Sequence, residues 1–334
     1  MRKVALAIVL TLAGCSAPTM QPGNFTMPAA AHDPAGTPFR AASIHPNRER
    51  SWMLAPANTG CAYDEVLPPC GLLYLSEFSQ DDVLVFQHDT VVGTLTGFNG
   101  PDGVCSDKSG NVWISNNRGA SVVEYAHGGT KPIATLKDPG VYPLGCSVNP
   151  ITGSVAVANF STTASGRGSI AIYHHATGKP LILTDPDIYY MYFCGYDSAG
   201  NLYVDGLNTS GAFQFAELPR NKYKFTSITL DTTVYFPGNV QWDGKHVDVG
   251  DQMYQNSVAS AVYRTDGAGG QVVGTTVLSD SQDVVGYWIQ ATNLIGPDAN
   301  LNDVGLYRYP IGGKATLRVG RLHEPYGAAV SYPR

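Results

Sequence analysis

Carboxylate and amide side chains recur where short apolar stretches of this chain end. The clearest cases are Glu77, Asn159, Asp205 and Asp251. Their oxygens suit a calcium ion, provided that several of them converge on one point. A side chain of this kind also commonly bonds the backbone of a neighbouring loop. The pattern therefore predicts either a cation site or a set of loop-stabilising residues.

Aromatic residues accompany these acids at the approaches to other apolar stretches. Tyr192, Trp288 and Tyr326 are the examples that we expect to meet Asp205 and Asp251 around one mouth of a central channel. A mouth lined by carboxylates and aromatic rings suits a sugar, a small organic molecule, a peptide or a cation. The alternative is that the rings pack between neighbouring structural units. These five residues are the candidate ligand-binding residues.

Other chemistry finds little support in the sequence. The chain has no G-x-S-x-G, H-E-x-x-H or P-loop string, and it has no C-x-x-C pair. Only 14% of the residues are charged, the formal net charge is −6, and basic residues form no stripe. Nucleic-acid binding rests on Lys and Arg that neutralise phosphates, so we expect no nucleic-acid partner.

The residues that would position these side chains belong to a repeat. Short apolar stretches that end in an aromatic residue recur at intervals of about 40 to 50 residues. The ends of these stretches are Phe86, Tyr125, Tyr173, Phe215, Tyr263 and Tyr307. Self-similarity at this period, built from short strands, predicts a β-propeller.

The clearest unit is GPDGVCSDKSGNVWISNN at residues 100–117, and related units occupy 144–160, 193–206, 239–251 and, more weakly, 286–298. Over residues 71–334 this strand–turn–strand pattern resembles the NHL-type and gluconolactonase-like repeat. The resemblance implies an all-β, six-bladed propeller with four antiparallel strands in each blade. For the gluconolactonase-like members it also implies a divalent metal held in the channel, with Glu77, Asn159, Asp205 and Asp251 at places where such ligands arise.

The two ends of the repeat region complement each other. The last unit, EPYGAAVSYPR, has no second strand after it, and the first unit, GLLYLSEF, has no strand before it. We therefore expect the C-terminal strand to pair with residues 72–78 and close a ring of six blades, which removes exposed sheet edges. Residues 49–56 are an alternative source of part of a further blade.

The N-terminus has the pattern of a secretory signal. Arg2 and Lys3 precede an apolar run that is too short to cross a bilayer, and the run leads to Leu12-Ala13-Gly14-Cys15. This ending resembles a bacterial lipobox, which implies lipidation of Cys15 and anchoring in the cell envelope, at the outer membrane where two membranes are present. The alternative is an ordinary signal that is cut near Ala17. We expect residues 16–48, rich in Ala and Pro, to form a flexible tether and residues 49–70 to form a separate N-terminal segment.

The remaining cysteines divide into two groups. Cys61 and Cys70 bound a short loop, and we expect them to form a disulfide because an exported protein can retain one. Cys105, Cys146 and Cys194 occur once per repeat in the same type of strand. We expect these three to be small buried apolar residues rather than disulfide partners.

Two functions follow as hypotheses. The first is an exported, lipid-anchored propeller that acts as a binding or scaffold module for a small molecule, glycan or protein, without a required cofactor. The second is a metal-dependent lactonase, hydrolase or lyase that uses the channel mouth, with calcium as its metal. Stoichiometric metal in the purified protein would favour the second.

Overall fold

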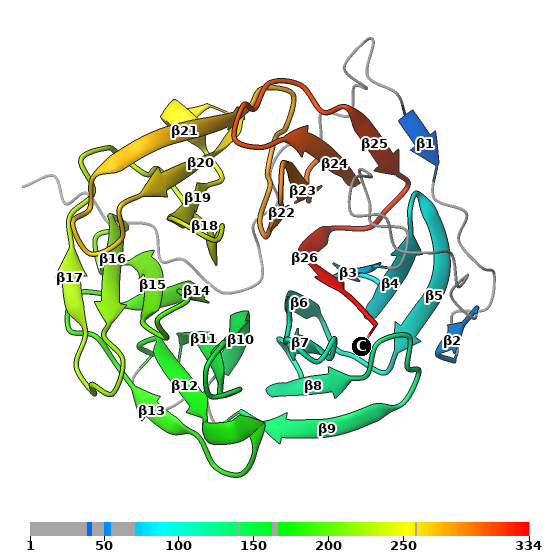
Figure 1. Ribbon diagram of the computed structural model, residues 1–334, viewed down its shortest axis with the longest axis horizontal. Helices are drawn as coiled ribbons and strands as arrows, with labels where there is room; N and C mark the ends of the chain where they lie inside the picture. Colours follow the sequence, from blue (N-terminus) through cyan, green and yellow to red (C-terminus); the bar gives the residue numbers. More distant parts are fainter. Residues whose placement is uncertain are drawn as a thin grey trace, which may run out of the picture.

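The computed structural model describes residues 39–41, 50–54, 71–138, 141–161, 166–257 and 259–333. Within these residues, strands form six sheets that are arranged as blades around a central axis (Figure 1). Each blade contains four antiparallel strands, and its innermost strand lies closest to the axis. The expected all-β, six-bladed propeller is confirmed.

The strands of each blade follow one another from the axis outward. Blade I contains β26 (Pro325–Ser331), β3 (Leu72–Glu77), β4 (Asp82–Gln87) and β5 (Thr90–Thr96). Blade II contains β6 (Pro101–Ser106), β7 (Val112–Asn116), β8 (Ser121–Tyr125) and β9 (Pro132–Lys137). Blade III contains β10 (Val141–Val148), β11 (Val155–Ser161), β12 (Ser169–Tyr173) and β13 (Leu181–Leu183).

The other three blades repeat this order. Blade IV contains β14 (Tyr190–Tyr196), β15 (Leu202–Leu207), β16 (Phe213–Leu218) and β17 (Thr226–Ile228). Blade V contains β18 (Pro237–Trp242), β19 (Val247–Asp251), β20 (Ser260–Thr265) and β21 (Val272–Leu278). Blade VI contains β22 (Trp288–Gln290), β23 (Asn293–Asp298), β24 (Asp303–Arg308) and β25 (Leu317–Gly320). Short 3-10 turns occur at His174–Ala176 and Tyr254–Asn256.

The ring closes inside blade I. Strand β26, from the C-terminus, pairs antiparallel with β3, so that Ala329 lies opposite Tyr74 and Val330 lies opposite Leu73. The expected pairing of the C-terminal strand with residues 72–78 is confirmed. Because the final strand supplies the inner edge of the first blade, the blade is complete only when both ends of the repeat region have met.

Two short N-terminal strands lie on the outer rim of the ring. β2 (Trp52–Met53) pairs antiparallel with β5, and β1 (Phe39–Ala41) pairs in parallel with β25. Residues 52–53 therefore extend blade I and do not begin a further blade. β1 falls within the range expected to be a tether. The rest of that tether, Cys15, Cys61 and Cys70 lie outside the described residues.

The core is divided between the blades. One buried cluster, for example, combines Trp113 and Val122 of blade II with Val155, Val157 and Tyr173 of blade III. Strands in this position have apolar neighbours on both faces, which explains why their apolar runs are nearly continuous instead of alternating. The blades are thus held face to face mainly by burial of Val, Ile, Leu and aromatic side chains.

The innermost strands share a bulge near the axis. In five of them one extra residue interrupts the pairing with the second strand, for instance between Pro101 and Val104 of β6. A glycine in the bulge allows the next strand to approach closely. A Cβ on Gly103 would lie 2.4 Å from the Leu144 carbonyl oxygen, and a Cβ on Gly327 would lie 2.3 Å from that of Asp102. The ring therefore requires glycine at these positions.

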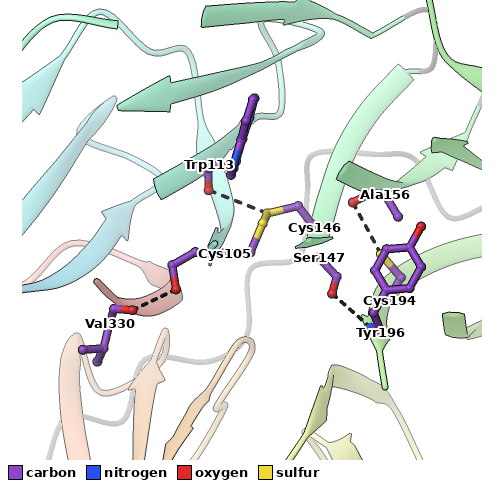
Figure 2. The surroundings of a disulfide bond; sticks show 9 residues. Cys105, Trp113, Cys146, Ser147, Ala156, Cys194, Tyr196 and Val330 are labelled. Carbon is purple, nitrogen blue, oxygen red and sulfur yellow. Dashed lines mark hydrogen bonds between the residues drawn. A yellow bond between two sulfur atoms is a disulfide. The ribbon is translucent and has the colours of Figure 1, made fainter. Parts of the chain in front are cut away.

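A disulfide joins the innermost strands of blades II and III (Figure 2). Cys105 and Cys146 have Cα atoms 5.8 Å apart, and both residues are buried. The expectation that they are unpaired was wrong. It assumed that neighbouring innermost strands splay too far apart around the channel for a bond. The bond links Cys146, the first paired residue after the bulge, to Cys105, which follows the equivalent Val104. At these two staggered positions the inner strands are close enough for a bond.

Cys194 occupies in blade IV the position that Cys146 occupies in blade III, and it is buried with a free thiol. Its Sγ donates to the Ala156 carbonyl oxygen of blade III at 3.8 Å. Burial raises the pKa of this thiol well above its usual value, which keeps it protonated. Between blades III and IV, Ser147 takes the place that Cys105 has between blades II and III. Its hydroxyl accepts a hydrogen bond from the Tyr196 amide (Figure 2).

This equivalence predicts that Ser147→Cys will form a second inter-blade disulfide with Cys194. The chain-entropy model gives a stabilisation of at most about 4 kcal/mol for a loop of this size. The lost hydrogen bond to the Tyr196 amide should reduce this gain by about 1 kcal/mol. Peptide mapping under non-reducing conditions should recover the two linked peptides, and Ser147→Ala provides the control for the lost hydroxyl. If Cys194 of oxidised Ser147→Cys is still alkylated on unfolding, the proposed equivalence is wrong.

Candidate binding site

Antiparallel blades place their loops on two opposite faces of the ring. Loops after the second and fourth strands lie on one face, here called the entry face, and loops after the first and third strands lie on the other, here called the turn face. Backbone hydrogen bonds link loops of the entry face, such as those from Phe78 N to Glu324 O and from Gly168 N to Tyr189 O. The candidate ligand-binding residues are expected on this entry face.

The acids and amides near the ends of the second strands all make the same type of contact. In each blade, the side chain bonds either the innermost strand of that blade or the segment that leads into it. The contacts are Glu77 Oε1 with His323 N (2.9 Å), Asn116 Oδ1 with Asn99 N (2.6 Å), Asn159 Nδ2 with Asp138 Oδ1 (3.1 Å), Asp205 Oδ1 with Phe193 N (2.8 Å), Asp251 Oδ1 with Phe236 N (3.1 Å) and Asp298 Oδ2 with Gln282 N (2.7 Å). This geometry matches the expectation that these side chains stabilise neighbouring backbone segments, which was the alternative to a cation site.

Asp205 and Asp251 are almost wholly buried. Their exposed fractions are 0% and 1%, so neither presents a carboxylate at the surface. Burial raises the pKa of both side chains, and the backbone hydrogen bonds from Phe193 and Phe236 oppose that rise. The second oxygen of Asp205 has no hydrogen-bond partner among the described residues. The Asp205 carboxyl group thus holds the bulge of β14, and the Asp251 carboxyl group holds the segment that leads into β18.

The candidate metal ligands come from four different blades. Glu77, Asn159, Asp205 and Asp251 each contact their own blade, in I, III, IV and V respectively. Within the described ranges, no group of three or more His, Cys, Asp or Glu side chains is placed to hold a metal ion. Calcium binding by these residues stays a prediction, to be tested by metal analysis of the purified protein.

The entry face carries a cluster of aromatic rings above blades III, IV and V. Phe160 stacks on Tyr190 with ring centroids 4.6 Å apart and meets the edge of Tyr192 at 5.3 Å. Tyr192 meets Phe236 edge-on at 5.5 Å, and Tyr189 meets Tyr190 at 4.7 Å. Tyr192 is 9% exposed and forms the base, while the other four rings are half-buried. This set is called the aromatic cluster below.

Arginine side chains cover aromatic rings at two points of the same face. Arg167 lies over Tyr189 of the aromatic cluster, with its guanidinium carbon 5.3 Å from the ring centroid. Across the mouth, Arg118 lies 4.4 Å over Phe78, which stacks on Tyr326 at 4.7 Å. Cation–π contacts of this kind hold the flexible arginine stems against the rings. Tyr326 therefore lies on the expected face, as part of a second aromatic group.

Trp288 lies elsewhere than expected. It follows a long approach segment in blade VI, and its partner across the blade is Ile295 rather than a residue at the strand end. The indole lines a cavity whose other walls are turns of the opposite, turn face. Trp288 was expected in the approach to the innermost strand, near the entry mouth, whereas it is paired within β22.

This cavity has a volume of about 500 Å³. Its walls come from the turn after β6, the turn after β10, Trp288 of β22, the end of β26, and Tyr332 and Pro333, which directly follow β26. The lining residues are Ser106, Asp107, Lys108, Ser109, Gly110, Val148, Asn149, Pro150, Gly153, Trp288, Val330, Tyr332 and Pro333. Sequence reasoning missed this site because the lining belongs to turns that the repeat pattern treats as connections.

An acid with a strongly shifted pKa lies beneath the second aromatic group. Asp102 is 3% exposed, and Asn117 Nδ2 donates to its Oδ2 at 3.4 Å. Burial raises its pKa to about 7, although the hydrogen bond from Asn117 lowers it. Burial also raises the pKa of Tyr326, and the charge of Asp102 raises it further. Asp102 thus changes its charge near neutral pH at the edge of the mouth.

Comparison with known proteins supports the fold and leaves the family open. No family model matches the chain, and no curated protein matches it. Three solved structures share the fold: a nidogen/laminin complex (15% identity, TM-score 0.63, 78% of this chain and 98% of that chain), a functionally unknown protein from Desulfotomaculum acetoxidans DSM 771 (12%, 0.52, 79% and 99%) and a protein of unknown function from Bacteroides caccae (13%, 0.57, 78% and 98%). At these identities the relation is one of fold alone.

The raised pKa of Asp102 predicts a pH-dependent stability. The folded protein holds a proton on Asp102 up to about pH 7, whereas the unfolded chain releases it near the ordinary value of 3.8. The stabilising contribution is therefore complete below about pH 4 and is lost as the pH rises towards about 7. Thermal unfolding across this range should show a steeper decline for the native protein than for Asp102→Asn. Parallel curves for the two proteins would contradict the assignment.

Proposed function

We propose that this protein is an exported, lipid-anchored binding module whose entry face binds a protein partner. The observation that carries the proposal is the aromatic cluster, in which four half-buried rings from three blades stand together with Arg167. Half-buried aromatic rings in one group leave apolar area in water, and such patches on soluble proteins commonly mark interaction sites.

The composition of this surface favours a protein partner. Tyr, Phe and Arg are enriched at protein interfaces, and Tyr and Arg often supply most of the binding energy there. Tyr235, beside the aromatic cluster, is 42% exposed and extends the same surface. Asp205 and Asp251 bond the backbone amides of Phe193 and Phe236 next to these rings, so little ordering is required when a partner binds.

Two further observations support export. The Cys105–Cys146 disulfide is typical of proteins that fold outside the reducing cytosol. The N-terminal Leu-Ala-Gly-Cys string offers a lipid anchor at Cys15. The described part of the chain has no helix with the length and hydrophobicity that a membrane crossing needs. A lipid on Cys15 is the attachment that this proposal requires.

Anchoring is tested by Cys15→Ser. The substitution removes the thiol that would receive the lipid, so the protein should leave the membrane fraction or accumulate with its signal uncleaved. Fractionation and mass spectrometry of the mature N-terminus measure both effects. A native N-terminus at Ala17 or later, without lipid, would show that the alternative secretory signal is the correct one.

Partner binding is tested by photo-crosslinking in intact cells. A photoreactive phenylalanine at position 235 places the probe on the entry face, and the same residue at position 223 places it on a loop of the turn face. Both native tyrosines are exposed, at 42% and 72%, so the two sites are comparable in access. Position 235 should give one discrete crosslinked protein that is absent for position 223.

A matched substitution completes this test. Tyr190→Ser within the aromatic cluster should abolish the crosslink from position 235 while the protein stays folded, because Tyr190 is only half-buried. Tyr223→Ser should leave the crosslink unchanged. Equal crosslinking from both faces, or a crosslink that survives Tyr190→Ser, would overturn the proposed interface.

A further inference from the structure

The six innermost strands can be compared at one level, which is the second paired residue after the bulge in five of them and the first paired residue of β22 in the sixth. Five of the residues there are small or polar, and the sixth is Trp288. The five are Ala329, Cys105, Ser147, Gly195 and Gln241. Trp288 is therefore the one bulky ring at this level of the described inner strands. It packs against the core clusters on both sides of blade I and is only half-buried, so part of its indole remains accessible.

The accessible part of the indole belongs to the cavity of about 500 Å³ on the turn face. Tyr332 and Val148 contribute further apolar surface on other walls of the cavity. A pocket with an aromatic wall and a few polar groups on the remaining sides is typical of small-molecule sites. Its volume suits a ligand of one or two sugar rings.

Two polar side chains of the lining offer hydrogen-bond acceptors. Ser106 Oγ donates its hydrogen to Val330 O at 2.8 Å, so its lone pairs remain as acceptors. Asp107 Oδ1 accepts from Ser109 N and Asn111 N, and Oδ2 accepts from the Asn111 side chain at 3.2 Å, which leaves acceptor capacity on Oδ2. A ligand with several hydroxyl groups can donate to such acceptors, whereas a plain hydrocarbon or aromatic acid cannot.

One cation stands at the rim of the cavity. Lys108 is exposed, and it has no ion pair or hydrogen bond with any other residue in the described part of the chain. A lysine ammonium on a flexible stem acts as a point charge that can reach an anionic group of a ligand. The chain as a whole is acidic, with a formal net charge of −6, so the positive charge of Lys108 is opposite in sign to the net charge of the protein.

From these observations we propose that the turn-face cavity binds an acidic sugar, a pyranose that carries a carboxylate. The apolar C–H face of the ring stacks on the Trp288 indole. Hydroxyl groups at its edge donate to Ser106 and Asp107, and its carboxylate pairs with Lys108. This site is separate from the proposed protein interface, because the two lie on opposite faces of the ring.

The test uses the full mature protein with glucuronate and glucose as probes, followed by ligand-observed NMR. Glucuronate should bind with saturation. Lys108→Met should raise its Kd by about fivefold, the upper end for one exposed ion pair, and should leave glucose binding unchanged. Lys222→Met, which alters an exposed lysine away from the cavity, is the matched control.

Trp288→Leu should weaken both sugars, and circular dichroism with thermal unfolding checks that this variant is folded. If it unfolds, Lys108→Met alone decides the outcome. Equal Kd values for glucuronate and glucose in the native protein, or the same loss with Lys222→Met, would overturn the proposal. So would the absence of saturable binding. Tyr190→Ser should not alter sugar binding, so failure of this site and failure of the protein interface are distinguishable.

Discussion

The close packing of backbones around the axis is the constraint on which the rest of this structure depends. At Gly103, Gly145 and Gly327, a side chain would collide with the main chain of the next innermost strand. Because these strands approach so closely, a side chain at any of these three glycines would have to displace the neighbouring innermost strand. The second-strand acids and amides serve the same requirement, since each one holds an innermost strand or the segment that leads into it.

This constraint separates structural from exposed residues at the entry mouth. The carboxyl groups of Asp205 and Asp251 lie below the loops and bond amides, while the rings of Phe160 and Tyr190 lie above and remain partly in water. A residue type that suggests chemistry in the sequence thus has a scaffolding role here, and the neighbouring aromatic residues form the surface. Substitutions of the acids should act on that surface indirectly, through the loops.

Much of the fold could be predicted because it repeats. The strand–turn–strand unit predicted six blades, and the missing strands at the two ends predicted the pairing of β26 with β3. Contacts between blades do not repeat in the same register, so they were not predictable from one unit. The disulfide joins staggered positions, Cys105 and Cys146, and Trp288 follows a longer approach segment than its counterparts do. Both lie where one blade meets the next.

The N-terminal strands bear on how an anchored ring would be presented. β1 lies on the outer edge of blade VI and β2 on the outer edge of blade I, so the chain reaches the ring at its rim rather than at either mouth. These two blades flank the closure, where β26 follows blade VI in the chain and completes blade I. β1 and β2 therefore pair with the outer strands of blades VI and I. The closure joins the same two blades near the axis. If a lipid holds the N-terminus, a force along the chain acts first on the outer strands of these two blades. The loops of both faces then stay available for ligands.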